Sequence, residues 1–171
     1  GTTSMSSGGT VLNANSISGK TVILENVIAT GNRNTKEHGG AFYLTGNAST
    51  VIEITNCTIT GNTAYKRGGA AYLKAGTIRI SGSTIADNTA EGNNKTKMAG
   101  LGGGLYIEGL KGAVISITDG TRLYNNHAEN ESKLVGTVGA SSDLLLANTS
   151  SITMTLDIDE SVSPYEAENG N

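Results

Sequence analysis

Apolar residues alternate with polar ones in short runs that return along the chain. Each run places aliphatic side chains two positions apart, which is the pattern of a β-strand with one buried face. The apolar members of these runs are Val22 and Leu24, Ile52 and Ile54, Ile78 and Ile80, Ile115 and Ile117, and then Ile152, Met154 and Leu156. Because the flanking residues also repeat, the runs are interpreted as one strand seen in successive turns of a solenoid.

An asparagine follows each of the first four runs. These asparagines are Asn32, Asn62, Asn88 and Asn126, at spacings of 30, 26 and 38 residues. Fixed landmarks at unequal spacing indicate insertions in one loop of each turn. A second short strand is expected just before each asparagine, around Val27, Cys57 to Ile59, Thr84 to Ile85, and Leu123. We expect the asparagines to hydrogen-bond to the backbone of the neighbouring turn and form a ladder; metal binding is the alternative.

A third strand begins with a glycine pair, read as GGAFYL at 39–44, GGAAYL at 68–73 and GGGLYI at 102–107. The pair indicates a tight bend into the strand, because no Lys-Ser/Thr and no helix follow as a phosphate-binding loop requires. Comparison between turns assigns each position to a face. The inward positions are Phe42, Ala71, Leu105 and Leu144, and Leu44, Leu73, Ile107 and Leu146; the outward ones are Tyr43, Tyr72, Tyr106 and Leu145, and Ala41, Ala70, Gly104 and Asp143.

Three strands per turn with turn asparagines predict an all-β fold, a right-handed parallel β-helix of about five coils with three short strands each. We expect one β-helix segment over residues 1–171, as a fragment of a larger protein. Within it, 1–16 is expected to form an N-terminal cap or partial coil, 17–156 the coils and 157–171 a C-terminal tail. One continuous core is predicted from Phe42, Leu44, Ile52, Ile54, Cys57, Leu73, Ile78, Ile80, Leu105 and Ile107.

The glycine-pair segments alternate with ITGN at 59–62 and IADN at 85–88. Together they resemble the paired GGA(I/L) and (F/I)xxN motifs of polymorphic membrane proteins and related bacterial surface adhesins. The resemblance covers about residues 17–156 and is specific for fold rather than for ligand. It implies the pectin-lyase-like superfold and an extracellular location, at the cell surface or secreted, with any signal and anchor outside these 171 residues.

Composition narrows the choice of partners. The net charge is −3 with cations scattered among acids, so nucleic acid is not expected as a partner. The single cysteine, Cys57, excludes an intrachain disulfide and is expected to be buried. No run of 18 apolar residues is present, so direct membrane insertion by this segment is not expected. We expect a monomer as an isolated segment, without cofactor, metal or catalytic residues.

A polysaccharide lyase is one alternative, because β-helices often carry such enzymes. That chemistry needs acidic calcium ligands on adjacent coils with a basic residue beside them. The sequence offers one Lys and one Glu on neighbouring coils, Lys74 and Glu108, which predicts a surface pair. His38 and His127 fall in the variable loops without partners at metal-ligand spacing.

The tyrosines are the most suggestive candidate for binding. Outward tyrosines on successive coils could stack on one another, or could offer a platform for a sugar or a peptide. Cationic loop residues, among them Lys95 and Lys97, would gather at the same edge and either keep it soluble or engage an anionic ligand. The candidate ligand-binding residues are Tyr43, Tyr72, Tyr106, Lys66, Arg67 and Lys74. The expected role is adhesion to a host or environmental glycan or surface protein; the alternative is a structural stalk that displays other domains.

Overall fold

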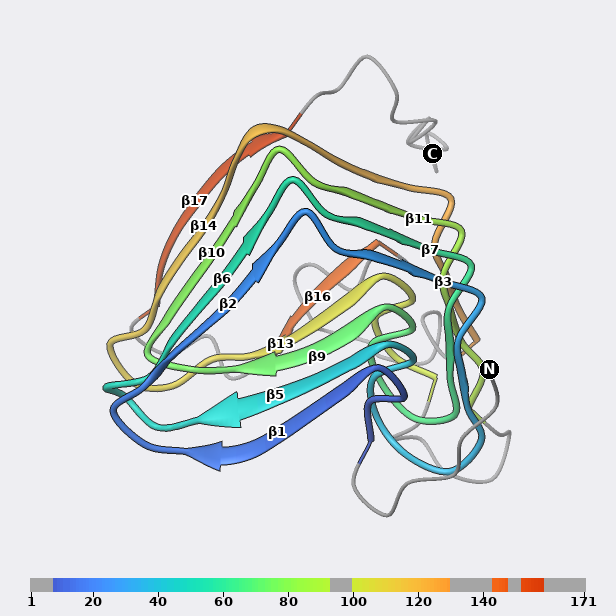
Figure 1. Ribbon diagram of the computed structural model, residues 1–171, viewed down its shortest axis with the longest axis horizontal. Helices are drawn as coiled ribbons and strands as arrows, with labels where there is room; N and C mark the ends of the chain where they lie inside the picture. Colours follow the sequence, from blue (N-terminus) through green and yellow to red (C-terminus); the bar gives the residue numbers. More distant parts are fainter. Residues whose placement is uncertain (1–7, 93–99, 130–142, 148–151, 159–171) are drawn as a thin grey trace, which may run out of the picture.

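The computed structural model describes residues 8–92, 100–129, 143–147 and 152–158, and Lys95 and Lys97 lie outside these ranges. Every strand pairing in it is parallel and joins equivalent positions of neighbouring turns. Figure 1 shows the strands of each kind nested side by side around a common interior. The predicted fold class, an all-β parallel β-helix, is confirmed.

Two wide faces contain the long strands. The first face is formed by β1 (Leu12–Ile17), β5 (Phe42–Gly46), β9 (Ala71–Lys74), β13 (Leu105–Glu108) and β16 (Leu144–Ala147). The second face is formed by β2 (Thr21–Glu25), β6 (Val51–Thr55), β10 (Thr77–Ser81), the first part of β14 (Val114–Tyr124), and β17 (Thr153–Ile158). Most of β1 falls within the stretch expected to be a cap or partial coil, where it pairs with β5 as a strand of the first coil.

The third face is narrower, and β14 runs unbroken from the second face into it. It is formed by β3 (Ile28–Thr30), β7 (Thr58–Thr60), β11 (Thr84–Ala86) and the end of β14. A fourth set of two-residue strands follows the asparagines, where the sequence predicted a polar loop. These are β4 (Arg33–Asn34), β8 (Thr63–Ala64), β12 (Thr89–Ala90) and β15 (His127–Ala128). Two residues are too few for a period-2 pattern to be recognised.

The core fills the interior of the coils as one cluster. All ten residues predicted to form it belong to this cluster, and each is at most 1% exposed. Cys57 is buried here as expected, and burial raises the pKa of its thiol. Because each coil has little core of its own, the apolar side chains are covered mainly by those of the coils on either side.

The asparagine ladder forms as predicted, and Asn62 shows its pattern. The Asn62 Oδ1 accepts hydrogen bonds from the backbone N and the Nδ2 of Asn32, at 3.0 and 2.9 Å. Its Nδ2 donates to the Ala29 carbonyl at 2.9 Å and to the Asn88 Oδ1 at 3.0 Å. Both Asn62 and Asn88 are fully buried. Every donor and acceptor position of the Asn62 amide is therefore used inside the protein.

A left-handed residue precedes every asparagine of the ladder. Gly31, Gly61, Asp87 and Asn125 have φ values of 64°, 63°, 56° and 53°. Glycine, asparagine and aspartate are the residues that adopt this conformation at least cost. The turn thus aims the following asparagine into the coil, where it meets the asparagine of the next coil.

The position of Ala41, Ala70, Gly104 and Asp143 faces inward, so its assignment to the outward face was wrong. Ala41 and Ala70 are fully buried within the core cluster. Asp143 accepts two hydrogen bonds on Oδ1, from the backbone N and the Nδ2 of Asn126, at 3.1 and 2.6 Å. The alternation fails here because the backbone N of Ala41 and that of Phe42 both bond to the Ala70 carbonyl, which bulges the chain just before the strand. The carboxylate of Asp143 thereby ends the ladder.

The two glycines of each pair have different roles. The first, as at Gly68, has a φ of +67°, a left-handed conformation that glycine adopts at the least cost. At the second, as at Gly69, a Cβ would overlap the Gly103 carbonyl oxygen and lie 2.6 Å from the backbone of Thr89. The backbone just before β9 therefore lies so close to β12 that no side chain fits at Gly69. The second glycine is needed for this close packing, in addition to the bend that the first one makes.

Replacing Asn62 with Leu is expected to lower the free energy of unfolding by about 1 to 3 kcal/mol, because buried groups of Asn32, Ala29 and Asn88 lose their partners. Asn32→Leu is the matched control. Asn32 lies at the partly exposed end of the ladder and should lose less. Chemical denaturation of both variants measures the difference; equal losses would contradict the ladder as a stabilising element.

Gly69→Ala is expected to destabilise the protein by about 3 kcal/mol or more, because backbone atoms on two sides must move to admit a methyl group. Gly31→Ala provides the comparison, since a Cβ there meets nothing within 4 Å and only the positive φ opposes it. That variant should lose about 1 kcal/mol. Thermal unfolding of the two proteins tests the order, and a Gly69→Ala protein as stable as Gly31→Ala would refute the close approach.

Candidate functional site

Three tyrosines form a continuous stack on the outer side of the first face. The ring centroids of Tyr43 and Tyr72 are 5.1 Å apart, and those of Tyr72 and Tyr106 are 5.2 Å apart with an interplanar angle of 11°. Parallel pairing of β5, β9 and β13 brings them into register. Tyr72 and Tyr106 are each only 5% exposed, whereas Tyr43 is partly exposed. We call these three residues the tyrosine stack.

A second column of side chains lies against the tyrosine stack. It consists of His38, Arg67 and Leu101, each of which directly precedes a glycine pair. The His38 ring lies 4.9 Å from that of Tyr72 and 6.1 Å from that of Tyr43. The Arg67 guanidinium lies 5.0 Å from the ring centroid of Tyr106, in a cation–π contact. Leu101 is 3% exposed and packs in one cluster with the tyrosines.

A charged row runs beside the stack on the same strands. Lys74 Nζ forms an ion pair with Glu108 Oε1 at 2.6 Å, and the Tyr72 hydroxyl donates a hydrogen bond to Glu108 Oε2. Burial of Tyr72 and its bond to Glu108 raise the pKa of the phenol. Burial opposes ionisation of Glu108, but the hydrogen bonds from Lys74 and Tyr72 outweigh it and hold the pKa of this carboxyl below its ordinary value. The row ties β9 to β13.

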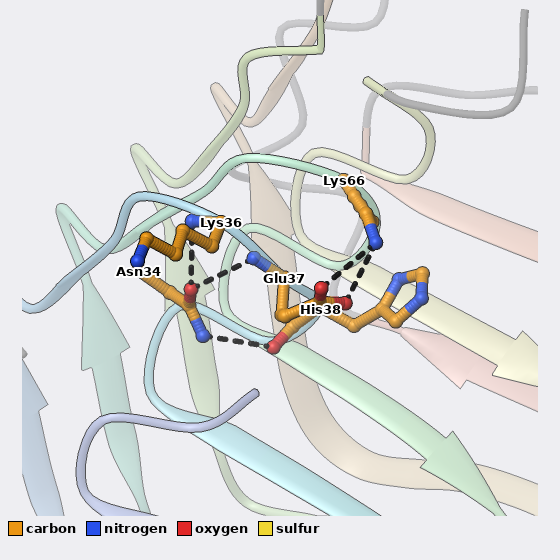
Figure 2. Close-up of polar contacts among 5 residues, drawn as sticks. All are labelled: Asn34, Lys36, Glu37, His38 and Lys66. Carbon is orange, nitrogen blue, oxygen red and sulfur yellow. Dashed lines mark hydrogen bonds and ion pairs between the residues drawn. The ribbon is translucent and has the colours of Figure 1, made fainter. Parts of the chain in front are cut away.

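The loop that carries His38 is held by side-chain caps. The Asn34 Oδ1 accepts from the backbone N of Lys36 at 3.1 Å and from that of Glu37 at 2.9 Å, and its Nδ2 donates to the His38 carbonyl (Figure 2). Lys66 Nζ, from the next coil, bonds to both carboxylate oxygens of Glu37 at 2.9 and 2.8 Å. The loop is therefore fastened to its own coil by Asn34 and to the next coil by Lys66.

His38 is neutral in this environment. Its Nδ1 is buried and has no hydrogen-bond partner. Burial, followed by the positive charges of Arg67 and Lys66, lowers the pKa of the imidazole to about 4. The nearby carboxylates of Glu37 and Glu108 act in the opposite direction but do not prevail, since each is already paired with a lysine.

The structure brings all six candidate ligand-binding residues to one side of the first face. Lys74 pairs with Glu108 as the sequence predicted, and Lys66 and Arg67 stand in the loop beside the stack. Of the two alternatives for the outward tyrosines, the structure shows stacking. The rings of Tyr72 and Tyr106 cover one another and are covered by the second column. His38 and Leu101 were missed as parts of the site. Their shared place before each glycine pair was the available signal.

No group of three or more His, Cys, Asp or Glu side chains in the described ranges is arranged to hold a metal ion. His127 stands apart from the stack, near Glu129 at 3.5 Å. In the part of the chain that the structure describes, no helix is long and apolar enough to cross a membrane.

Comparison with known proteins gives one finding. Residues 56–74 match the family model for the Chlamydia polymorphic membrane protein repeat. This stretch runs from the corner before β7 through the asparagine Asn62 and the glycine pair to the end of β9, so it contains both motifs of the resemblance and the site residues Lys66, Arg67, Tyr72 and Lys74. No curated protein and no solved structure matches the chain.

Glu108→Gln is expected to lower the free energy of unfolding by about 1 kcal/mol, because Lys74 loses its ion pair and Tyr72 a charged acceptor. The pKa of Tyr72 should fall toward its ordinary value in this variant, although burial remains. Glu53→Gln is the matched control, since its partner Arg79 is more exposed and the pair at 3.1 Å should contribute about 0.5 kcal/mol or less. Denaturation and ultraviolet titration of the phenols measure both effects; a Tyr72 pKa unchanged by Glu108→Gln would contradict the bond.

Proposed function

We propose that this chain is a non-catalytic segment of a bacterial cell-surface or secreted protein, and that it adheres to a glycan or protein through the tyrosine stack and its charged surroundings. The match to a polymorphic membrane protein repeat supports a surface protein of the adhesin type. The observation that carries the choice of site is the convergence of aromatic and cationic residues from three coils on one side of the first face.

Contact with a ligand is proposed at the accessible margin of this site. Tyr43 is partly exposed, and the side chains of Lys66 and Lys74 are 36% and 32% exposed. Tyrosine combines an apolar ring with a hydroxyl that can bond to a sugar or a peptide. Tyr72 and Tyr106 support the margin from beneath, because their rings fix the position of Tyr43 and of Arg67.

The charges at the margin favour an anionic ligand. Lys66 and Arg67 are adjacent in one loop, and Lys36 is exposed in the loop of the preceding coil. Glu37 offsets part of this charge through its pair with Lys66. An acidic glycan or an acidic protein segment would therefore be preferred, with binding that weakens as salt rises.

A structural stalk is the second candidate. It is favoured because the side chains of the site already have partners within the chain. The tyrosine rings stack on one another, and Glu108 pairs with Lys74 and accepts the hydrogen bond of Tyr72, so none of these groups needs a ligand. A carbohydrate-active enzyme has less support. The Lys and Glu that could take part in such chemistry form an ion pair, and Glu108 also accepts the hydrogen bond of Tyr72.

A panel of acidic and neutral glycans and matrix proteins, titrated against the full chain, tests the proposal. Tyr43→Ala and Lys66→Ala should each weaken binding of the recognised ligand by about tenfold, which corresponds to about 1.4 kcal/mol. Arg79→Ala removes one cation from the outer side of the second face and should bind as the wild type does.

Circular dichroism must first show that each variant keeps its β-sheet signal. Equal binding by the wild type, Tyr43→Ala and Lys66→Ala would exclude this site. Absence of binding to any member of the panel would leave the stalk as the better interpretation.

A further inference from the structure

The column of His38, Arg67 and Leu101 covers the tyrosine stack with three side chains of different chemistry. Leu101 is uncharged and Arg67 carries a guanidinium. His38 is the member whose charge changes between neutral and acidic solution. It also covers the end of the stack where Tyr43 is partly exposed, and its ring lies within 6.1 Å of that of Tyr43 and 4.9 Å of that of Tyr72.

We propose that His38 is an acid-operated cover of the tyrosine stack: the neutral imidazole packs over Tyr43 and Tyr72, and protonation turns it outward and opens these rings to a ligand. This inference rests on the proposed function in one respect, namely that the opened rings bind the ligand. The movement of His38 itself needs no ligand and can be tested without one.

The protonated ring does not fit its place. With Nδ1 buried and lacking a partner, a second N–H would point into a volume that offers no acceptor. The positive charges around it come from Arg67 and Lys66, both in the loop between β8 and β9. Contact of an imidazolium with the tyrosine rings would offset part of this cost. Burial of the imidazole and the two like charges oppose protonation and lower its pKa to about 4.

Every other charged or titratable group around His38 is already engaged. Glu37 of the same loop pairs with Lys66. Glu108 on β13 pairs with Lys74 of β9 and accepts from the phenol of Tyr72. Burial raises the pKa values of Tyr43 and Tyr106, so both phenols stay neutral over the acid range. As the pH falls toward 4, the change of charge in this region therefore includes protonation of His38 itself.

Hydrogen bonds hold the backbone of the loop, whereas ring contacts with Tyr43 and Tyr72 hold the imidazole of His38. The His38 carbonyl accepts from the Asn34 Nδ2 and from the backbone N of Gly9, and the backbone N of Gly39 bonds to the Arg67 carbonyl at 2.9 Å. Figure 2 shows the bonds of Asn34 within the loop and the Glu37–Lys66 pair, with the imidazole of His38 projecting beside them. Rotation of the His38 side chain can therefore open the stack without unfolding the loop.

The sign of the pH dependence follows from the lowered pKa. His38 has a higher proton affinity when it is turned out to solvent than when it covers the rings, so acid favours the open form. The covered form predominates at neutral pH. As the pH falls from the ordinary histidine value of 6.5 toward 4, an increasing fraction of the molecules opens.

The test measures exposure of the tyrosines in the full chain, without ligand. Flavin-sensitised photo-CIDNP detects tyrosine rings that a dye can reach, and NMR titration follows the imidazole of His38 in the same samples. The expected result is a severalfold rise in the Tyr43 and Tyr72 signals between pH 7 and about pH 4, in step with protonation of His38 and with an unchanged β-sheet circular dichroism.

His38→Phe and His38→Gln replace the switch with side chains that do not titrate, and both should abolish the rise. His127→Phe removes the exposed histidine of β15 and should retain it. Tyrosine signals that do not change in the wild type, or that change equally in both His38 variants, would overturn the proposal.

Binding of heparin, used as a sulfated glycan probe, separates this inference from the proposed function. Acid-induced exposure of the rings without heparin binding at either pH supports the cover and counts against adhesion to anionic glycans. Heparin binding through Tyr43 and Lys66 that is equal at pH 7 and about pH 4, with no change in tyrosine exposure, supports adhesion and overturns the cover.

Discussion

The interior asparagines fix the register on which the rest of this β-helix depends. Each amide accepts from one coil and donates to the next, so a coil cannot slip along its neighbour without breaking several buried hydrogen bonds. That register stacks isoleucine on isoleucine in the core and tyrosine on tyrosine outside it. The tyrosine stack and the charged row beside it are therefore consequences of a constraint located at another corner of the coil.

The sequence predicted the three main sets of strands well, because each strand recurs at the equivalent position of successive coils. A single strand such as Thr84–Ala86 is too short to recognise alone, but it aligns with Thr58–Thr60 one coil earlier. The two-residue strands were not predicted, since two positions cannot show alternation. The inward turn of Asp143 was not predicted either, because it depends on a backbone bulge and because a charged residue in a core position is improbable unless a partner such as Asn126 is near.

The sequence named six residues of the candidate site but missed His38 and Leu101, and it left open whether the tyrosines are covered. Alternation correctly separated Tyr72 from Leu73, but it does not say what lies over the outer side of a strand. The covering residues come from the loop before each glycine pair, whose path depends on caps such as Asn34 and on contacts with the next coil. The exposure of the tyrosine rings is therefore decided by how the loops of neighbouring coils pack. Aromatic and cationic side chains then share a small surface, in which Lys66 pairs with Glu37 and Lys74 pairs with Glu108.

The carboxylate at the end of the ladder has a consequence for how such a chain can change in length. The side-chain bonds from each asparagine to the next all run in one direction, and in the described residues Asp143 accepts the last of them; its carboxylate has no amide donor with which to continue the series. Each whole coil between Asn32 and Asn126 accepts a hydrogen bond from the asparagine before it and donates one to the asparagine after it. Duplication or loss of such a coil would therefore leave both ends of the asparagine ladder unchanged. The protein is thus modular in units of one coil, and gene rearrangements that respect this unit would lengthen or shorten the rod and its tyrosine stack together.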